Sequence, residues 1–297
     1  MKSITSKSKI FFTVSAVFIV LSIVLLFVRG LNFGIDFTGG TTLQFNLNQK
    51  YTADIEKDIR DIVKENTKKT GIVVQQTGEK GVSITTPELS NEESDKVIEA
   101  IKTSYKLEQK DLLANDKVSG SVSGRLILDS LKAIALAILL MLLYITWRFD
   151  FKSGTCAVIA LAHDVIIMLG FYALFQFTVS TSFIAAILTI VGYSINATII
   201  VFDRVRENAR FSKNMTANQN VDNAVKSSFF RALNSSITTL LTIGVLYVMG
   251  VDSIREFALP IIVGIVAGTY SSLLLAPPFW AWWKNAETKK KKAYKSK

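Results

Sequence analysis

The stretch Gly192 to Asn208, GYSINATIIVFDRVREN, decides the fold class of this chain. Its first part is apolar but contains polar side chains, among them Ser194 and Asn196, and its end is charged from Asp203 and Arg204 onward. Polar groups at membrane depth are costly, so they line a pathway or a contact between helices. The stretch therefore predicts a membrane protein whose function lies between its helices.

The rest of the chain agrees with this class. Hydrophobic residues make up 49% of the 297 residues, and the mean hydropathy is +0.35. A membrane-spanning helix needs about 20 apolar residues. Six stretches meet this requirement: Ile10–Val28, Leu126–Trp147, Gly154–Phe177, Ser182–Phe202, Phe229–Met249 and Phe257–Trp283. Residues 126–283 thus hold the second to sixth spans.

The first span follows a basic start, as the apolar core of a signal peptide does. It continues into Val28-Arg29-Gly30-Leu31 without the small-residue pattern of a cleavage site, so we interpret it as an uncleaved anchor. The one cysteine, Cys156, lies within a predicted span and cannot form an internal disulfide. The cysteine content therefore carries no information about the redox compartment.

The distribution of basic residues predicts the orientation. Lysine and arginine gather in the tail of residues 1–9, in the loop after the second span, in a linker of about residues 204–228, and in the tail of residues 284–297. The short loops on the other side offer only Arg255. Basic residues stay on the cytoplasmic side of a membrane, so both termini are predicted to be cytoplasmic, in a multi-pass plasma membrane protein.

The loop of residues 31–125 is the only long one and must be external. Leu43, Phe45 and Leu47 alternate as in a strand, and further strand and helix patterns follow. Ser90 with Glu93 forms a capping box for a second helix. The order βαββαβ predicts a ferredoxin-like α+β domain between the first and second spans.

Several function classes are disfavoured by composition. The external loop has no His, no Cys and no glycine-rich phosphate loop, so an interaction role is favoured over catalysis, and no cofactor or metal site is expected. The net charge of +10 lies outside residues 32–125, which hold 13 Lys and Arg against 15 Asp and Glu. The basic charge therefore indicates topology and contact with anionic membrane lipids, and nucleic-acid binding is the weaker interpretation.

An ion pathway needs groups that change charge or bind an ion inside the bilayer. Asp164 lies near the middle of the third span, beside His163, the only histidine. Arg231 and Asn234 enter with the fifth span. A carboxylate beside an arginine of a neighbouring helix would form a gated pair, because the arginine keeps the acid ionised until a proton or ion competes.

Each of these groups also has a structural interpretation. Asp164 could only link two helices, and His163 could be a packed neutral histidine. Asn196 and Ser194 could hold helices together. Asp203 and Arg204 fall at the membrane interface, where a solvated pair is expected, and Arg231 could anchor to headgroups.

Two glycine pairs have packing explanations. Gly264 and Gly268 form a GxxxG step, which allows a partner helix to approach closely, either within this bundle or in another subunit. Gly39 and Gly40 allow a tight turn at the exit from the membrane. Pro277 and Pro278 are expected to kink the last span near its end.

Several motifs resemble those of the SecD/SecF protein-export family, which belongs to the resistance-nodulation-division (RND) superfamily. The segment GIDFTGGT is similar to the family's signature beyond the first span, and it holds Gly34, Asp36, Gly39 and Gly40. The segment beginning Gly192, Tyr193 and Ser194 is similar to the fourth-span signature of the SecF branch. Arg231 to Ser236, Phe257 to Leu259 and Gly264 to Ser272 resemble its fifth and sixth spans.

The resemblance implies six transmembrane helices that form half of an RND-type transporter. It implies a subunit that pairs with SecD, joins the SecY-E-G channel, and assists the export of unfolded polypeptides with a proton or sodium gradient. If such a gradient is used, the polar and charged groups within the spans make Asp164, Asn196, Arg231 and Asn234 the predicted members of the ion-coupling pathway.

One position departs from the family pattern. The fourth-span signature places Asp after the Asn, whereas this chain has Ala197, which can neither carry a proton nor bind a cation. The path could run through Asp164 and a SecD carboxylate, the chain could be a substituted or uncoupled version, or it could serve chiefly as a scaffold.

Functions of other classes remain as alternatives. A scaffold subunit without ion coupling is the main one. A small-molecule RND exporter would need two such halves and larger external domains. A membrane enzyme is disfavoured, because Gly192-Tyr193-Ser194 is a weak nucleophile motif without a suitable base.

Overall fold

A computed structural model describes residues 3–78, 80–211 and 214–295, with the backbone alone for residues 252 and 289–295. The chain forms two compact units. One, the helical unit, combines Met1–Asn32 with Leu131–Lys297. The other, the external unit, is Phe33–Ser130.

The predicted spans correspond to six helical segments that are long and apolar enough to cross a membrane. They are α1 (Ser8–Val28) with the short η1 (Thr5–Lys7) before it, α5 (Gly120–Arg148), α6 (Phe151–Phe175), α7 (Thr181–Phe211), α8 (Ala217–Met249), and α9 (Asp252–Leu274) with α10 (Ala276–Lys295). Helices α7 and α8 extend through most of the region predicted as a linker. The two-residue strands β1 (Asn32–Phe33) and β6 (Thr178–Val179) lie in the connections.

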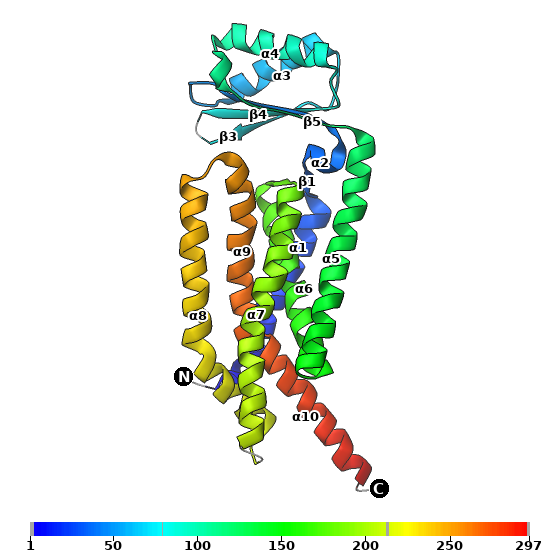
Figure 1. Cartoon of the computed structure of the whole chain (residues 1–297), viewed down its shortest axis with the longest axis vertical. Helices are drawn as coiled ribbons and strands as arrows, with labels where there is room; N and C mark the ends of the chain where they lie inside the picture. The colour runs from blue at the N-terminus through cyan, green and yellow to red at the C-terminus, as the bar shows by residue number, and fades with distance from the viewer. Residues whose placement is uncertain (1–2, 79, 212–213, 296–297) are drawn as a thin grey trace. The chain divides into compact units, whose positions relative to one another are not determined.

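The last span is broken where the sequence predicts a kink. Helix α9 ends at Leu274, Leu275 has φ −113° and ψ −57°, and α10 begins at Ala276. Pro277 and Pro278 cannot donate backbone hydrogen bonds to the preceding turn, and their rings crowd it. Figure 1 shows α10 leaving the direction of α9 at this point.

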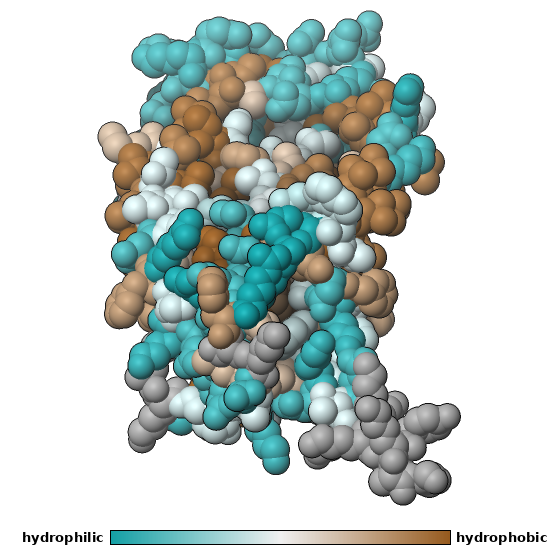
Figure 2. Space-filling model, turned by 60° about the horizontal axis from the view of Figure 1, so that its bottom comes forward, coloured by the Kyte–Doolittle hydropathy of each residue, from teal (hydrophilic) through white to brown (hydrophobic). Residues whose placement is uncertain are grey.

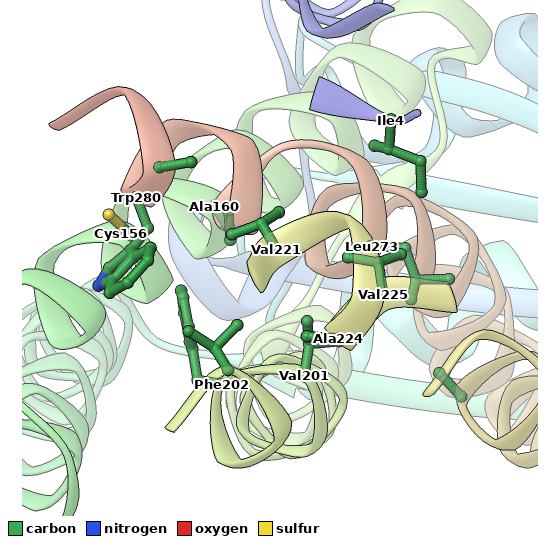
Figure 3. Packing of buried hydrophobic residues seen from close by; sticks show 14 residues of the cluster. Ile4, Cys156, Ala160, Val201, Phe202, Val221, Ala224, Val225, Leu273 and Trp280 are labelled. Carbon is green, nitrogen blue, oxygen red and sulfur yellow. The ribbon is translucent and has the colours of Figure 1, made fainter. Parts of the chain in front are cut away.

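The helices differ in how much of their apolar surface the unit buries. In the most apolar stretches of α6, α7 and the α9–α10 span, 44–61% of residues are buried, against 0–11% in α1, α5 and α8. Helices α6, α7 and α9 therefore form the centre. Figure 3 shows one hydrophobic cluster, in which Ile4 joins side chains of α6 to α10 such as Cys156, Phe202, Val221 and Trp280.

The external unit has the predicted βαββαβ order. It runs β2 (Gly40–Asn46), α3 (Ala53–Thr67), β3 (Val73–Thr77), β4 (Gly81–Thr86), α4 (Asn91–Tyr105) and β5 (Leu112–Val118), with the short α2 (Ile35–Thr38) and η2 (Gln109–Asp111). The antiparallel sheet has the order β3-β4-β2-β5. Both helices cover one face of the sheet (Figure 1), over a core that includes Phe45, Ile59, Ile84 and Ile101. This confirms the ferredoxin-like prediction.

The paired glycines start the first long strand of this unit. Gly39 has φ +70° and Gly40 has φ +137°, values that side chains rarely allow. A Cβ on Gly40 would lie 2.3 Å from the Thr86 carbonyl oxygen of β4. The pair therefore permits both the turn and the close approach of β2 to β4.

Candidate functional site

A buried carboxylate lies at the centre of the helical unit. Asp164 is halfway along α6, and its side chain has no exposed surface. Helices α6, α7 and α9 surround it, and α1 reaches it through His163. An ionised carboxylate at such a place needs hydrogen-bond donors, because burial without them costs several kcal/mol.

Asp164 has three hydrogen-bond partners. Its Oδ2 accepts hydrogen bonds from Ser194 Oγ of α7 at 2.7 Å and from Ser271 Oγ of α9 at 2.9 Å. Its Oδ1 lies 3.0 Å from His163 Nδ1. One carboxylate thus links the three central helices.

His163 extends this network to the first helix. Its Nε2 lies 2.9 Å from Ser15 Oγ of α1, and the ring of Tyr270 stacks on the imidazole with centroids 6.2 Å apart. When the hydrogen is on Nδ1, that nitrogen donates to Asp164 and Nε2 accepts from Ser15. Tyr270 donates in turn to the Phe11 carbonyl at 3.0 Å, which holds α9 against α1.

A second polar link joins α7 to α9 one turn away. Thr198 Oγ1 and Ser272 Oγ are 2.8 Å apart, and Ser272 donates to the Ser194 carbonyl at 3.1 Å. All three side chains are buried. Polar side chains thus hold the α7–α9 contact at the level of the carboxylate and one turn beyond it.

The GxxxG step lets these helices approach. A Cβ on Gly264 would lie 2.5 Å from Ile190 Cγ1 of α7, and one on Gly268 would lie 3.0 Å from Ser194 Oγ. The two glycines therefore allow a close contact between α9 and α7. Of the two interpretations of the GxxxG step, the structure favours a contact within this bundle over one with another subunit. A side chain at Gly268 would also come within 3.4 Å of Asp164 Oδ2, so it would crowd the hydrogen bond between Ser194 and Asp164.

This arrangement can exchange a proton or hold a small cation. Asp164 has hydroxyl and imidazole partners, and no arginine or lysine among the described residues forms an ion pair with it. Neutralising the carboxylate would turn an acceptor of three hydrogen bonds into a group that must donate one. In the described residues no cluster of three or more His, Cys, Asp or Glu side chains suits a metal ion.

The hypothesis of a gated pair between Asp164 and Arg231 needs a correction. Arg231 of α8 is exposed and contacts neither Asp164 nor its partners. It lies near the start of the apolar part of α8 and forms no ion pair with a described residue. Serine and histidine, not arginine, hold the carboxylate.

The other predicted site residues divide into two groups. Ser194 belongs to the hydrogen-bond network of Asp164. Ala197, three residues later in α7, is buried, with 7% of its surface exposed. Asn196 and Asn234 are exposed at positions within the predicted spans, and neither forms a hydrogen bond with a described residue. The pathway predicted from the sequence therefore contains both buried residues, such as Asp164, and residues that are exposed on the helical unit, such as Asn196 and Asn234.

Three further motif residues lie at the edges of this site. Tyr193 has a buried hydroxyl without a partner in the described part of the chain. Asp203 pairs with Arg148 at 3.4 Å, and Arg204 pairs with Glu207 at 2.5 Å, with all four side chains substantially exposed. These ion pairs suit the interfacial location expected from the sequence.

Ser15, Tyr270 and Ser271 were not predicted as site residues. Ser15 is a single hydroxyl in an apolar helix, a common feature with no functional signal. Ser271 lies three residues after Gly268, so the same face of α9 carries the glycine and the serine. That spacing was the signal available for Ser271, once Gly268 was assigned to the α7 contact.

Comparisons with known proteins assign the class of this membrane protein. The family description "Protein export membrane protein SecD/SecF, C-terminal" matches residues 97–286, and the "SecD/SecF GG Motif" matches residues 24–50. The first match alone covers more than half of the chain. The chain therefore belongs to the SecD/SecF protein-export family.

Relatives over the whole length belong to the SecF branch. The chain is 36% identical to the "Protein translocase subunit SecF" of Sebaldella termitidis, over 91% of this chain and 87% of the relative. It is 34% identical to the SecF of Petrotoga mobilis over 92% of both chains. It is also 34% identical to the SecDF of Bacillus subtilis, over 97% of this chain but only 39% of that longer protein.

A solved structure agrees with the fold. The crystal structure of SecDF from Thermus thermophilus, described as a translocon-associated membrane protein, matches 95% of this chain with a TM-score of 0.86 and 31% identity. This chain spans 38% of that SecDF chain. The six helices and the inserted external unit thus correspond to part of a longer SecDF protein.

Proposed function

We propose that this chain is the SecF-like subunit of the Sec protein translocase, which pairs with SecD and assists polypeptide export with an ion gradient. The observation that carries the proposal is the buried Asp164, held by Ser194, Ser271 and His163 from neighbouring positions. In a family of protein-export membrane proteins, a charge-changing group at this depth has a direct use.

Unpaired polar groups at membrane depth support a partner. Asn196, Arg231 and Asn234 are exposed in membrane-spanning helices and have no hydrogen-bond or ion-pair partner among the described residues. Lipid tails cannot satisfy such groups. The six-span SecD half, which SecDF relatives carry in the same chain, would supply the missing partners.

The positions of the termini support the proposed topology. The start of α1 and the end of α10 lie at the same end of the helical unit (Figure 1). Figure 2, turned to bring that end forward, shows hydrophilic side chains gathered there and hydrophobic ones toward the flanks. With the basic residues of the two tails, this supports cytoplasmic termini in the plasma membrane.

The proposed coupling follows from the hydrogen bonds of Asp164. A proton or a sodium ion at the carboxylate replaces donors now supplied by Ser194 and Ser271, so the contact between α7 and α9 has two states. Moving one charge through 100 mV supplies about 2.3 kcal/mol, enough to shift a two-state element whose conformations differ by a few kcal/mol. The external unit would then hold and release the emerging unfolded polypeptide beside the SecY-E-G channel.

Ala197 favours a second candidate function. With alanine where the SecF pattern has aspartate, the chain could act as an assembly subunit that supports SecD without ion coupling of its own. In that case the Asp164 network would only join helices.

One experiment separates the two candidates. Precursor translocation into membrane vesicles with this chain and its SecD partner is measured with and without an imposed ion gradient, for wild type and for Asp164→Asn. Coupling predicts that the gradient stimulates the wild type and not the variant. Asp203→Asn, at an exposed interfacial ion pair, is the control and should keep the stimulation. Equal stimulation of all three proteins would show that Asp164 does not couple the gradient to export, and would favour the scaffold function for this chain.

A further inference from the structure

An apolar groove opens between α1 and α6 on the surface of the helical unit. Its volume is about 400 Å³. Phe12, Ala16 and Ile19 line it from α1, at a spacing that places them on one helix face, and Ile159 and Ile166 line it from α6. We name this surface the α1–α6 groove. It is separate from the Asp164 carboxylate, but Ser15 and His163 of the hydrogen-bond network line it.

The polar side chains in the α1–α6 groove are Ser15 and His163. They already form a hydrogen bond with each other at 2.9 Å, and His163 is also bonded to Asp164. The groove thus offers no free polar group to a ligand at its inner end. It fits an apolar chain, and an apolar chain there would cover the Ser15–His163 hydrogen bond.

The α1–α6 groove continues into a second hollow at the end of α10. Phe279 lines both, with its ring 6.5 Å from that of Phe12. The second hollow has a volume of about 550 Å³ and is also lined by Lys152, Trp282 and Trp283. Trp282 is 64% exposed. Tryptophan and lysine side chains are typical of the headgroup level of a membrane.

The second hollow holds one charged pair. Lys152 and Glu287 both line it and form an ion pair with each other, which occupies part of the three N–H donors of Lys152. Lys9 lies one helical turn before Phe12, and the sequence of the last part of α10 holds four lysines at residues 289–292. The surroundings are therefore net basic, as at cytoplasmic surfaces that attract anionic lipids.

We propose that the two hollows bind one anionic phospholipid. An acyl chain fills the α1–α6 groove, and the phosphate group lies near Lys152 with the glycerol region against Trp282. A lipid is the occupant that explains the whole surface, because it alone joins a long apolar part to an anionic group across the membrane interface. A helix of a partner protein would leave Lys152 and Trp282 unexplained.

The test uses the full-length protein purified in detergent and analysed by native mass spectrometry. Phosphatidylglycerol and phosphatidylcholine with identical acyl chains are offered at equal concentration. We expect about fivefold stronger retention of phosphatidylglycerol, the effect of one lysine beside an anionic lipid. In Lys152→Gln the preference for phosphatidylglycerol should fall toward equal retention. Equal retention by the wild type would overturn the assignment of the headgroup.

The acyl chain is tested by filling the groove. Ala16→Trp and Ala162→Trp, on α1 and α6, should each reduce retention of both lipids severalfold. Val17→Trp is the matched control, because Val17 is 61% exposed and lies outside the groove. Unchanged lipid retention in both groove variants, once each elutes as a folded protein, would contradict the proposal. Lys152→Gln remains decisive for the headgroup even if both tryptophan variants misfold.

A photocrosslinking residue at position 159 distinguishes a lipid from a protein. In membranes that also contain the SecD partner, a crosslink to phospholipid supports the proposal. A crosslink to SecD or to a second copy of this chain overturns it. None of these measurements depends on export, so the lipid site and the proposed ion coupling succeed or fail separately.

Discussion

At the residue scale, the proposed ion coupling depends on how Asp164 is held. Ser194 and Ser271 contact the same carboxylate oxygen, so removing one donor leaves the other in place. Ser271→Ala is expected to destabilise the helical unit by about 1–3 kcal/mol, because a buried acceptor loses a hydrogen bond. Thermal unfolding in detergent measures this change. Ser235→Ala, at an exposed hydroxyl of α8, is the control and should stay within about 0.5 kcal/mol of wild type.

The second prediction at this scale concerns Ala197. Ala197→Asp restores the carboxylate of the family pattern at a buried position near the Asp164 network. Gradient-dependent export should rise, since a second group in the membrane could carry the ion. The measurement is precursor translocation with and without an uncoupler. If export and its response to uncouplers do not change, position 197 does not carry the ion in this protein.

Predictability from sequence also differed residue by residue. Asp164 and Ser194 were identifiable because a carboxylate and a polar motif stand out within apolar spans. Ser15 was not, because a serine in a membrane helix is ordinary until the fold places it 2.9 Å from a histidine. Arg231 was assigned to the carboxylate because charge alone suggested a pair, and sequence spacing does not show which face of α8 it occupies.

At the element scale, Gly40 sets the packing of two strands. Gly40→Ala places a methyl group 2.3 Å from the Thr86 carbonyl oxygen at a φ of +137°. The overlap and the strained backbone should destabilise the external unit by about 2–5 kcal/mol. Gly78→Ala is the matched control, because Gly78 has φ +66° but open space around it, so we expect only about 1–2 kcal/mol. Amide hydrogen exchange of β2 and β4 in the full-length protein measures both, and equal effects would contradict the packing argument.

The capping box of α4 makes a pH-dependent element. The backbone N–H of Ser90 donates to the Glu93 carboxylate, and Lys69 adds a second hydrogen bond, so the pKa of Glu93 is lowered from its ordinary 4.5. A lowered carboxyl pKa contributes stability above pH 4.5, and this stability is lost as the pH falls through the folded-state value. We expect the protection of the amides at the start of α4, relative to their intrinsic exchange at the same pH, to fall in acid.

The matched variant for this element is Glu93→Gln, compared with wild type at each pH because intrinsic exchange also depends on pH. The wild type should exchange more slowly than the variant at neutral pH, and the two should converge in acid. A constant difference across the pH range would show that the carboxylate does not cap the helix.

Element prediction succeeded where local chemistry is strong. Ser90 and Glu93 located the start of α4, and the two prolines located the break between α9 and α10. The prediction of a linker at about residues 204–228 was less informative. Helix α7 continues into this region as far as Phe211, and helix α8 already begins within it at Ala217. Their ends carry polar residues toward water while Val205, Val221 and Val225 pack inside, a pattern weaker than that of a membrane span.

At the scale of the whole molecule, the uncovered surfaces indicate which helices meet a partner. The exposed side chains of α1 are mostly apolar, as Val17 and Leu21 are, which suits lipid. On α8, by contrast, Asn234, Thr238 and Thr242 recur every four residues and are exposed. Sequence alone could not separate these cases, because both helices read as apolar spans and only the fold shows which faces stay open.

This contrast predicts where SecD binds. Thr238→Cys, labelled with a short thiol-reactive photocrosslinker, should crosslink to the proposed SecD partner. The Thr238 and Thr242 hydroxyls bond to carbonyls of α8 itself, but the exposed Asn234 amide on the same stripe has no partner among the described residues and needs one inside a membrane. A cysteine replacing Val17 is the control and should not crosslink. The native Cys156 is buried and is replaced by alanine in both variants, which leaves one thiol for each test. Crosslinking through Val17 but not Thr238 would assign the SecD contact to α1, so the polar groups of α8 would need a different partner.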